Sequence, residues 1–281
     1  MDEDPRRASR GRTGTHQTIN RWQNRVLMDL PRCYLICANA RCGSTLLSRA
    51  LSDTGIAGHP DEYFVTGPLE AFAPGARFWE DGRLARQHGV ANRDEFIELV
   101  YRVGSTPNRV FGAKWMWNYV GWALENFREL TRFSDASVET VFHEMFPGLR
   151  VIHVVRRDRL RQAISWLRAA EEDVWVVSDD EPARPIREPV YQYDVIVGMM
   201  DLIAEGEKSW VDLYEKLGVI PLTVEYEELT SPDGYDPTIR QVLRHLDLDD
   251  TIELPRPRTK RQADSVNDDW VSRFHRDHRS S

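Results

Sequence analysis

Lysine is scarce in this chain of 281 residues, and the chain carries no net positive charge. Its 37 basic residues are outnumbered by 45 acidic ones, which gives a formal net charge of −8. A chain of this charge has no basic field over its whole surface, which argues against general binding to nucleic acid. Only four basic residues are lysines, so 33 are arginines, which suit planar recognition of oxyanions. A GC-rich genome accounts for most of such an excess, but each lysine position becomes informative.

Cysteine and long apolar runs are also lacking. The three cysteines, Cys33, Cys37 and Cys42, lie within ten residues at spacings that fit no common zinc pattern. An odd, low count makes no disulfide framework and favours a reducing, cytoplasmic location, so we expect these cysteines in the core. No run approaches the ~20 apolar residues of a membrane span. The N-terminus has no apolar segment of the signal-peptide kind.

The order of the elements predicts an α/β fold. Residues 1–30 begin with a segment rich in Arg, Gly, Ser and Thr, which predicts a flexible extension, and residues 31–281 a single domain. Strands and helices alternate through that domain, which predicts a P-loop-type three-layer domain with a mostly parallel central sheet flanked by helices. We expect strands at 33–38, 110–113, 150–155 and 219–226, and helices at 44–55, 94–103, 117–130, 137–145, 158–175, 191–217 and 236–246. The rest of 59–109 reads as irregular.

The turn after the first strand resembles a phosphate-binding loop without its usual lysine. It reads A-N-A-R-C-G-S-T against the nucleotide template G-x-x-x-x-G-K-[ST]. Gly43 and Thr45 fit, whereas Ala38 replaces the first glycine and Ser44 the lysine, with a basic residue upstream at Arg41. Backbone N–H groups, a helix N-terminus and two hydroxyls still suit an oxyanion. An ordinary turn with a Ser/Thr cap explains the loop alone equally well.

A second strand favours the anion-binding interpretation. In a nucleoside triphosphatase a buried strand ends at an Asp that helps hold Mg²⁺. Here the strand at 150–155 is followed by Arg156 and Arg157, and Ser165 lies on the helix after them. These residues fall at the carboxyl edge of the predicted sheet, where α/β proteins bind ligands. The pattern predicts an anionic ligand that protein cations neutralise without metal.

These motifs resemble those of a known family. Ala40–Leu47 resembles the R-S-G-S-T-L-L loop that binds the 5′-phosphosulfate in sulfotransferases, and Arg156 with Ser165 resembles their element for the 3′-phosphate. Gly55–Phe64 is similar to the stretch G-x-A-G-x-P-x-E-[FY]-F of bacterial trehalose 2-sulfotransferases. Residues 106–108, 111–117, 161–166 and 261–264 also match. The order holds from about residue 33 to 275, which makes the whole set strongly specific although the loop alone is only moderately so.

The resemblance implies a donor, an acceptor class and an assembly. The donor would be 3′-phosphoadenylyl sulfate (PAPS), with adenosine 3′,5′-bisphosphate (PAP) as product and no metal. The acceptor would be a carbohydrate or a similar small molecule with a hydroxyl, and the enzyme often a homodimer. The sequence departs from the family at Cys42, where Ser is usual, and at His59, where the trehalose enzyme carries a carboxylate near its acceptor. The second departure leaves the acceptor open.

Roles for individual residues follow from the chemistry and the resemblance together. Sulfuryl transfer needs a base for the acceptor hydroxyl and cations near the leaving oxygen. Glu62, in a stretch rich in proline and aromatics that would partly desolvate it, is the expected base, and Lys114 and Arg41 the expected cations. The expected donor-binding residues are Arg41, Cys42, Gly43, Ser44, Thr45, Arg156, Ser165 and Arg261, and the expected acceptor-binding residues are His59, Glu62 and Trp117.

Bland alternatives stand beside these roles. An exposed glutamate is the usual fate of Glu, and a lysine at a strand end often only reaches for water. A small-molecule kinase of the P-loop kind would need ATP and Mg²⁺, against which the missing lysine and the arginine at the strand end argue. A non-catalytic nucleotide-binding module of the same fold is less consistent with keeping both Glu62 and Lys114.

Overall fold

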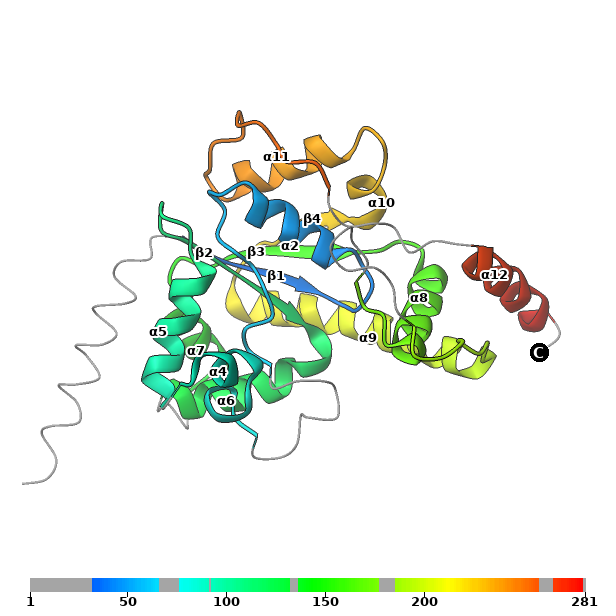
Figure 1. Ribbon diagram of the computed structural model, residues 1–281, viewed down its shortest axis with the longest axis horizontal. Helices are drawn as coiled ribbons and strands as arrows, with labels where there is room; N and C mark the ends of the chain where they lie inside the picture. The colour runs from blue at the N-terminus through cyan, green and yellow to red at the C-terminus, as the bar shows by residue number, and fades with distance from the viewer. Residues whose placement is uncertain are drawn as a thin grey trace, which may run out of the picture.

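A sheet of four parallel strands forms the centre of the computed structural model, which describes residues 32–65, 76–90, 92–131, 136–176, 185–257 and 265–279. The strands lie in the order β2-β1-β3-β4 (Figure 1). They are β1 (Arg32–Ala38), β2 (Val110–Met116), β3 (Arg150–Val155) and β4 (Leu222–Glu225). All three neighbouring pairs are parallel, so the carboxyl ends of the strands meet at one edge. The predicted fold class is confirmed.

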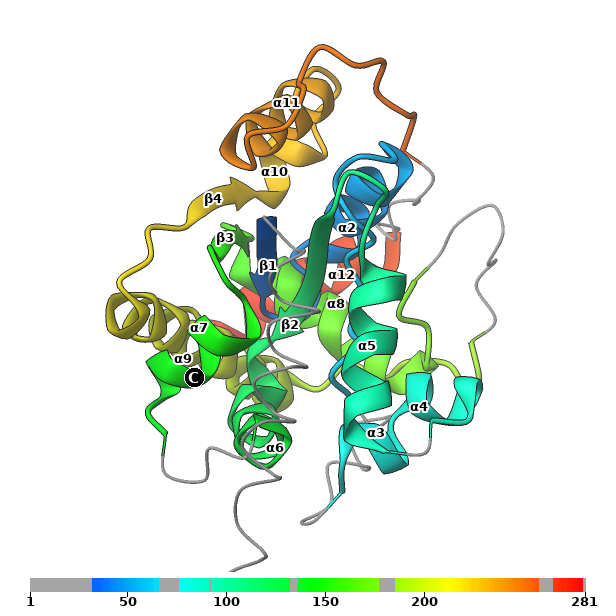
Figure 2. The same ribbon diagram turned by 90° about the vertical axis from the view of Figure 1, so that its left-hand side faces the viewer.

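Helices cover both faces of the sheet (Figures 1 and 2). One apolar cluster joins α2 and α11 to one face, and a larger cluster joins α5, α6, α7 and α9 to the other. The helical elements are α2 (Ser44–Asp53), α3 (Phe78–Asp81), α4 (Arg83–His88), α5 (Arg93–Gly104), the 3-10 turn η2 (Trp117–Tyr119), α6 (Val120–Thr131), α7 (Val138–Met145), α8 (Arg159–Glu172), α9 (Tyr193–Leu217), α10 (Tyr226–Leu229), α11 (Tyr235–His245) and α12 (Ser265–His278).

The central strand β1 shows why the sequence is apolar without a break there. Successive side chains of a strand point to opposite faces. Accordingly Leu35 joins the cluster with α9, and Ile36 joins the cluster with α2. Because both faces are covered, the whole strand from Cys33 onward is buried.

The three cysteines lie in this core, as expected. Cys33, Cys37 and Cys42 are buried and free. Burial raises the pKa of Cys33 to about 12 and that of Cys42 to about 11, and it also raises the pKa of Cys37. The thiols therefore stay protonated at neutral pH, which makes them poor nucleophiles.

Several element boundaries differ from those expected. Strand β2 runs to Met116 rather than ending at 113, because its pairing with β1 continues through Lys114. Helix α8 ends at Glu172 rather than 175, since Asp173 adopts a left-handed conformation and closes it. Strand β4 is shorter than 219–226. Two short helices, α3 and α4, fall in the stretch read as irregular, and α12 was not predicted.

Helix α12 packs far from its sequence neighbours. Its Trp270 and Phe274 join Ile164 and Leu167 of α8 in a third apolar cluster. The predicted extension at 1–30 and Arg261 lie outside the described residues. Among the residues that are described, no helix has the length and hydropathy to cross a membrane.

Candidate active site

The loop between β1 and α2 is held from its outer side. The side-chain amide of Gln162 on α8 donates to the carbonyl oxygen of Ala40 at 2.8 Å. The guanidinium of Arg156 donates to the carbonyl oxygen of Arg41 at 3.3 Å. These bonds turn carbonyl oxygens away from the mouth of the loop. The first N–H groups of a helix have no acceptor in their own helix, so the start of α2 offers donors to an anion.

Glycine is required at the last residue of this loop. Gly43 has φ of 90°, a left-handed conformation that side chains disfavour. A Cβ atom there would also lie 2.7 Å from the ring of Tyr226, the first residue of α10. The guanidinium of Arg156 lies 4.4 Å from the centre of the same ring. Tyr226 therefore braces both the loop and the arginine, a role that its expected place at the end of a strand did not reveal.

Arg41 and Arg156 form a cationic end of the site. Arg41 Nε donates to Ser165 Oγ at 3.0 Å, and its guanidinium also donates to the carbonyl oxygen of Trp175. Burial, and then the charge of Arg156, lower the pKa of Arg41 to about 10, so it stays charged at neutral pH. Two neighbouring cations and a hydroxyl are a donor set that fits a phosphate.

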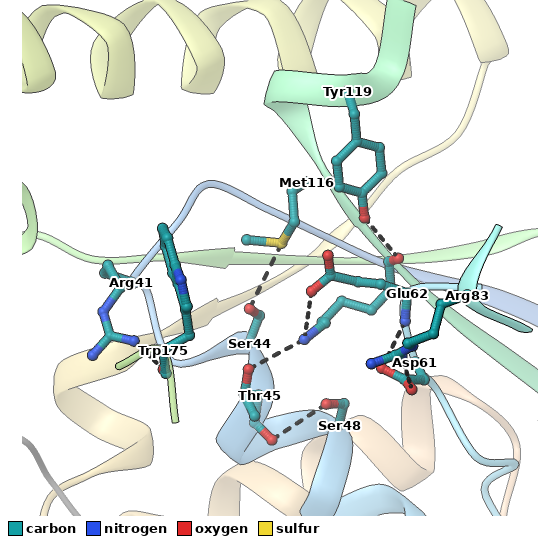
Figure 3. A network of polar contacts seen from close by, with 11 residues as sticks. Arg41, Ser44, Thr45, Ser48, Asp61, Glu62, Arg83, Met116, Tyr119 and Trp175 are labelled. Carbon is teal, nitrogen blue, oxygen red and sulfur yellow. Dashed lines mark hydrogen bonds and ion pairs between the residues drawn. The ribbon is translucent and has the colours of Figure 1, made fainter. Parts of the chain in front are cut away.

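Glu62 and Lys114 form the other end of the site (Figure 3). Lys114 Nζ lies 2.9 Å from Glu62 Oε1 and donates to Thr45 Oγ1 of α2 at 3.1 Å. The lysine side chain is only 6% exposed, whereas that of the glutamate is 31% exposed. The cation is thus buried beside the phosphate loop, and the carboxylate faces partly toward solvent.

Backbone pairing at the free edge of the sheet places Glu62. The carbonyl oxygen of Asp61 accepts the N–H of Lys114 at 3.0 Å, so this segment extends alongside β2. The approach is close at Gly58, where a Cβ atom would lie 2.8 Å from the nitrogen of Gly112. Because side chains alternate along an extended chain, Glu62 turns toward Lys114 while Asp61 pairs outward with Arg83 at 3.2 Å.

The predicted site residues therefore fall into two groups on one loop. Glu62, Lys114 and Thr45 are together, and Arg41 lies with Ser165 on the Trp175 side (Figure 3). The structure does not bring Arg41 to the Glu62–Lys114 pair in which its catalytic role was expected. That role stays a prediction, and so do the donor-binding roles of the loop residues.

The two other expected acceptor residues are placed less centrally. His59 is exposed, and its backbone groups bond to Gly104 and Tyr63. Trp117 packs edge-on against Trp210, with ring centres 5.1 Å apart. Their contacts with an acceptor stay predictions.

The structure also adds a residue that the sequence reasoning missed. Tyr119 is buried, and its hydroxyl donates to the carbonyl oxygen of Lys114 at 3.2 Å (Figure 3). Its position five residues after Lys114, at the end of a strand, was the available signal. No group of three or more His, Cys, Asp or Glu side chains suited to a metal ion occurs in the part of the chain that is described.

Comparison with known proteins is consistent along most of the chain. The family model of the Stf0 sulphotransferases matches residues 33–277. The trehalose 2-sulfotransferase of Mycolicibacterium smegmatis is 31% identical over 264 residues, covering 89% of this chain and 97% of that protein. The enzyme of the same name from Mycobacterium tuberculosis is 29% identical over 256 residues, covering 86% and 94%.

A solved structure shows a weaker likeness. The crystal structure of a sulfotransferase from Alicyclobacillus acidocaldarius aligns with a TM-score of 0.45 and 14% identity over 87% of this chain and 91% of that one. We base nothing on that likeness. The match of the family model over residues 33–277 is sufficient by itself. The chain belongs to the Stf0 sulphotransferase family.

Proposed function

We propose that this sulfotransferase moves a sulfuryl group from PAPS to a hydroxyl of a carbohydrate or a similar small molecule. The observation that carries the proposal is the contact of Lys114 with both Glu62 and Thr45. It puts a carboxylate that can accept a proton beside a buried cation at the phosphate loop. Base and cation are the two groups that transfer of a sulfuryl group requires.

The donor site fits a nucleotide with phosphates at two positions. The loop and the start of α2 suit the 5′-phosphosulfate, and Arg156 with Ser165 suits the 3′-phosphate. PAPS, when bound, supplies an activated sulfuryl group. Arg156 follows β3 at the place where a kinase of this kind would carry a metal-binding carboxylate, which disfavours ATP with Mg²⁺. The proposed donor requires no metal.

The chain's own residues would act as follows. Glu62 takes the proton of the acceptor hydroxyl as its oxygen bonds to sulfur and the bond from sulfur to the 5′-phosphate oxygen breaks. Lys114 stabilises the charge that grows on that leaving oxygen. Thr45 fixes the position of Lys114 through its hydroxyl. Burial of the ammonium strengthens its effect, because water screens it less.

The acceptor class is proposed from the relatives, which are named trehalose 2-sulfotransferases. Trehalose is therefore the first acceptor to test, with other disaccharides beside it. His59 and Trp117 are proposed to contact the acceptor, although His59 replaces a carboxylate. A homodimer and a cytoplasmic location stay predictions.

Thermal unfolding with added nucleotide tests the donor. PAP should raise the melting temperature at micromolar concentrations in the presence of EDTA, and Mg-ATP should not. AMP serves as the matched control, because it lacks the 3′-phosphate. Stabilisation by Mg-ATP but not by PAP would show that the donor is a nucleoside triphosphate and that the kinase interpretation is right.

A further inference from the structure

Tyr119 is a buried hydroxyl that the proposed chemistry has not used. It ends the 3-10 turn η2, which follows the last residue of β2. The turn folds the chain back, so that the Tyr119 hydroxyl donates to the carbonyl oxygen of Lys114 at 3.2 Å. Figure 3 shows the ring pointing its hydroxyl at the place where Glu62 and Lys114 meet.

The same hydroxyl also faces the carboxylate of Glu62. Burial raises the pKa of Tyr119, and the neighbouring Glu62 carboxylate raises it further through its charge and a hydrogen bond. The phenol therefore keeps its proton at any working pH. A Tyr hydroxyl has one proton to donate and can rotate between acceptors. It is shared here between the Lys114 carbonyl oxygen and the Glu62 carboxylate.

We propose that Tyr119 is a positioning residue that holds Glu62 and Lys114 in register for transfer. The proposal rests on the proposed function. While Glu62 is ionised, the hydroxyl supports its charge and aims the carboxylate. Once Glu62 has taken a proton, the hydroxyl can turn to the Lys114 carbonyl oxygen, which is already within reach. Tyr119 touches no reacting atom and acts only through these two residues.

The other charged groups around Glu62 are few in the described residues. Lys114 faces it from β2, and Thr45 of α2 presents a neutral hydroxyl to that lysine. Asp61 is its chain neighbour and pairs with Arg83 of α4. None of these groups reaches Glu62 from the side of η2, so the loss of the Tyr119 hydroxyl leaves no replacement donor on that side.

Tyr119→Phe removes the hydroxyl and keeps the ring. The first readout is carbon-13 NMR of the Glu62 carboxyl group, identified by its absence from the Glu62→Gln spectrum. Losing a hydrogen bond to a charged group should move the midpoint of the Glu62 titration up by about one pH unit. The second readout is kinetics: kcat should fall about tenfold, the acidic limb of its pH profile should move the same way, and Kd for PAP should not change.

Tyr101→Phe is the matched control. Tyr101 is also buried, and its hydroxyl donates to the carbonyl oxygen of Met145, away from the site. This variant should leave the Glu62 titration and kcat as in the parent. An unchanged Glu62 titration in Tyr119→Phe overturns the proposal, and so does an equal shift in Tyr101→Phe. If the parent enzyme transfers no sulfuryl group, the proposed function fails, while the NMR comparison still decides the role of Tyr119.

Discussion

Neutralising either partner of the Glu62–Lys114 pair should have unequal effects on stability. Glu62→Gln leaves an ammonium that is 6% exposed, with only the Thr45 hydroxyl and the new amide oxygen as partners. Breaking a fully buried ion pair from one side costs about 3–5 kcal/mol. The remaining acceptors and the partial exposure of the carboxylate side reduce this to about 2 kcal/mol. That corresponds to a fall of about 4–8 °C in melting temperature.

Lys114→Met should cost less, although it removes the same pair. The methionine fills the buried path of the lysine stem, and the abandoned Glu62 is 31% exposed, so water can reach it. We expect a change within about 1 kcal/mol. PAP should also stabilise Glu62→Gln more than the parent, because its anionic groups replace the lost carboxylate beside Lys114. In Lys114→Met the stabilisation by PAP should instead be weaker.

Differential scanning calorimetry measures all of these changes. Asp61→Asn is the matched control, because it neutralises the adjacent carboxylate in a pair whose side chains are 53% and 58% exposed. That exposed pair contributes about 0–1 kcal/mol. If Glu62→Gln unfolds at the temperature of Asp61→Asn, or if Lys114→Met loses more stability than Glu62→Gln, the cation is not buried in the way described.

Three further predictions concern the loop, the donor site and pH. Gly43→Ala should abolish PAP binding measured by calorimetry, because the left-handed backbone and the Tyr226 ring leave no room for a methyl group. Arg156→Met and Ser165→Ala should each reduce the preference for PAP over AMP by roughly 10–100-fold, and unchanged ratios would place the 3′-phosphate elsewhere. Burial lowers the pKa of His153 to about 4, so its unfolded form binds a proton first as pH falls below about 6.5. Stability should fall by about 3 kcal/mol between pH 6.5 and 4, and denaturant titration of His153→Gln should show a smaller fall.

The strands and the loop were predictable from local sequence. A run such as Cys33–Ala38 is apolar on both sides because both sides are covered, and that pattern is visible without a structure. The strand-turn-helix order around Gly43 is likewise local. The end of β2 was not predictable, because Lys114 breaks the apolar pattern and only pairing with β1 keeps it in the strand.

The site was predictable in its residues more than in its contacts. Glu62 and Lys114 were singled out separately, but their pairing depends on the segment around Asp61 joining the edge of β2. Tyr226 lies beside Gly43 only after β4 and α10 are folded. Contacts between segments so far apart in the chain follow from tertiary packing, which no local pattern encodes.

Helix α12 shows the same limit at the end of the chain. Its Trp270 packs on α8, and its Asp268 pairs with Arg161 at 2.7 Å across more than a hundred residues of sequence. The residues read as charged and polar rather than as a core helix. Burial on a distant helix is what stabilises it.

The most direct test of the account is transfer of the sulfuryl group itself. The parent enzyme and Glu62→Gln are incubated with PAPS and trehalose, or a panel of other disaccharides, in EDTA, and sulfated product is followed by mass spectrometry beside the Kd for PAP. The account predicts metal-independent transfer by the parent and a rate lower by roughly 10²–10⁴-fold in Glu62→Gln at unchanged Kd. Transfer by Glu62→Gln at the parent rate, or activity only with Mg-ATP, would contradict it.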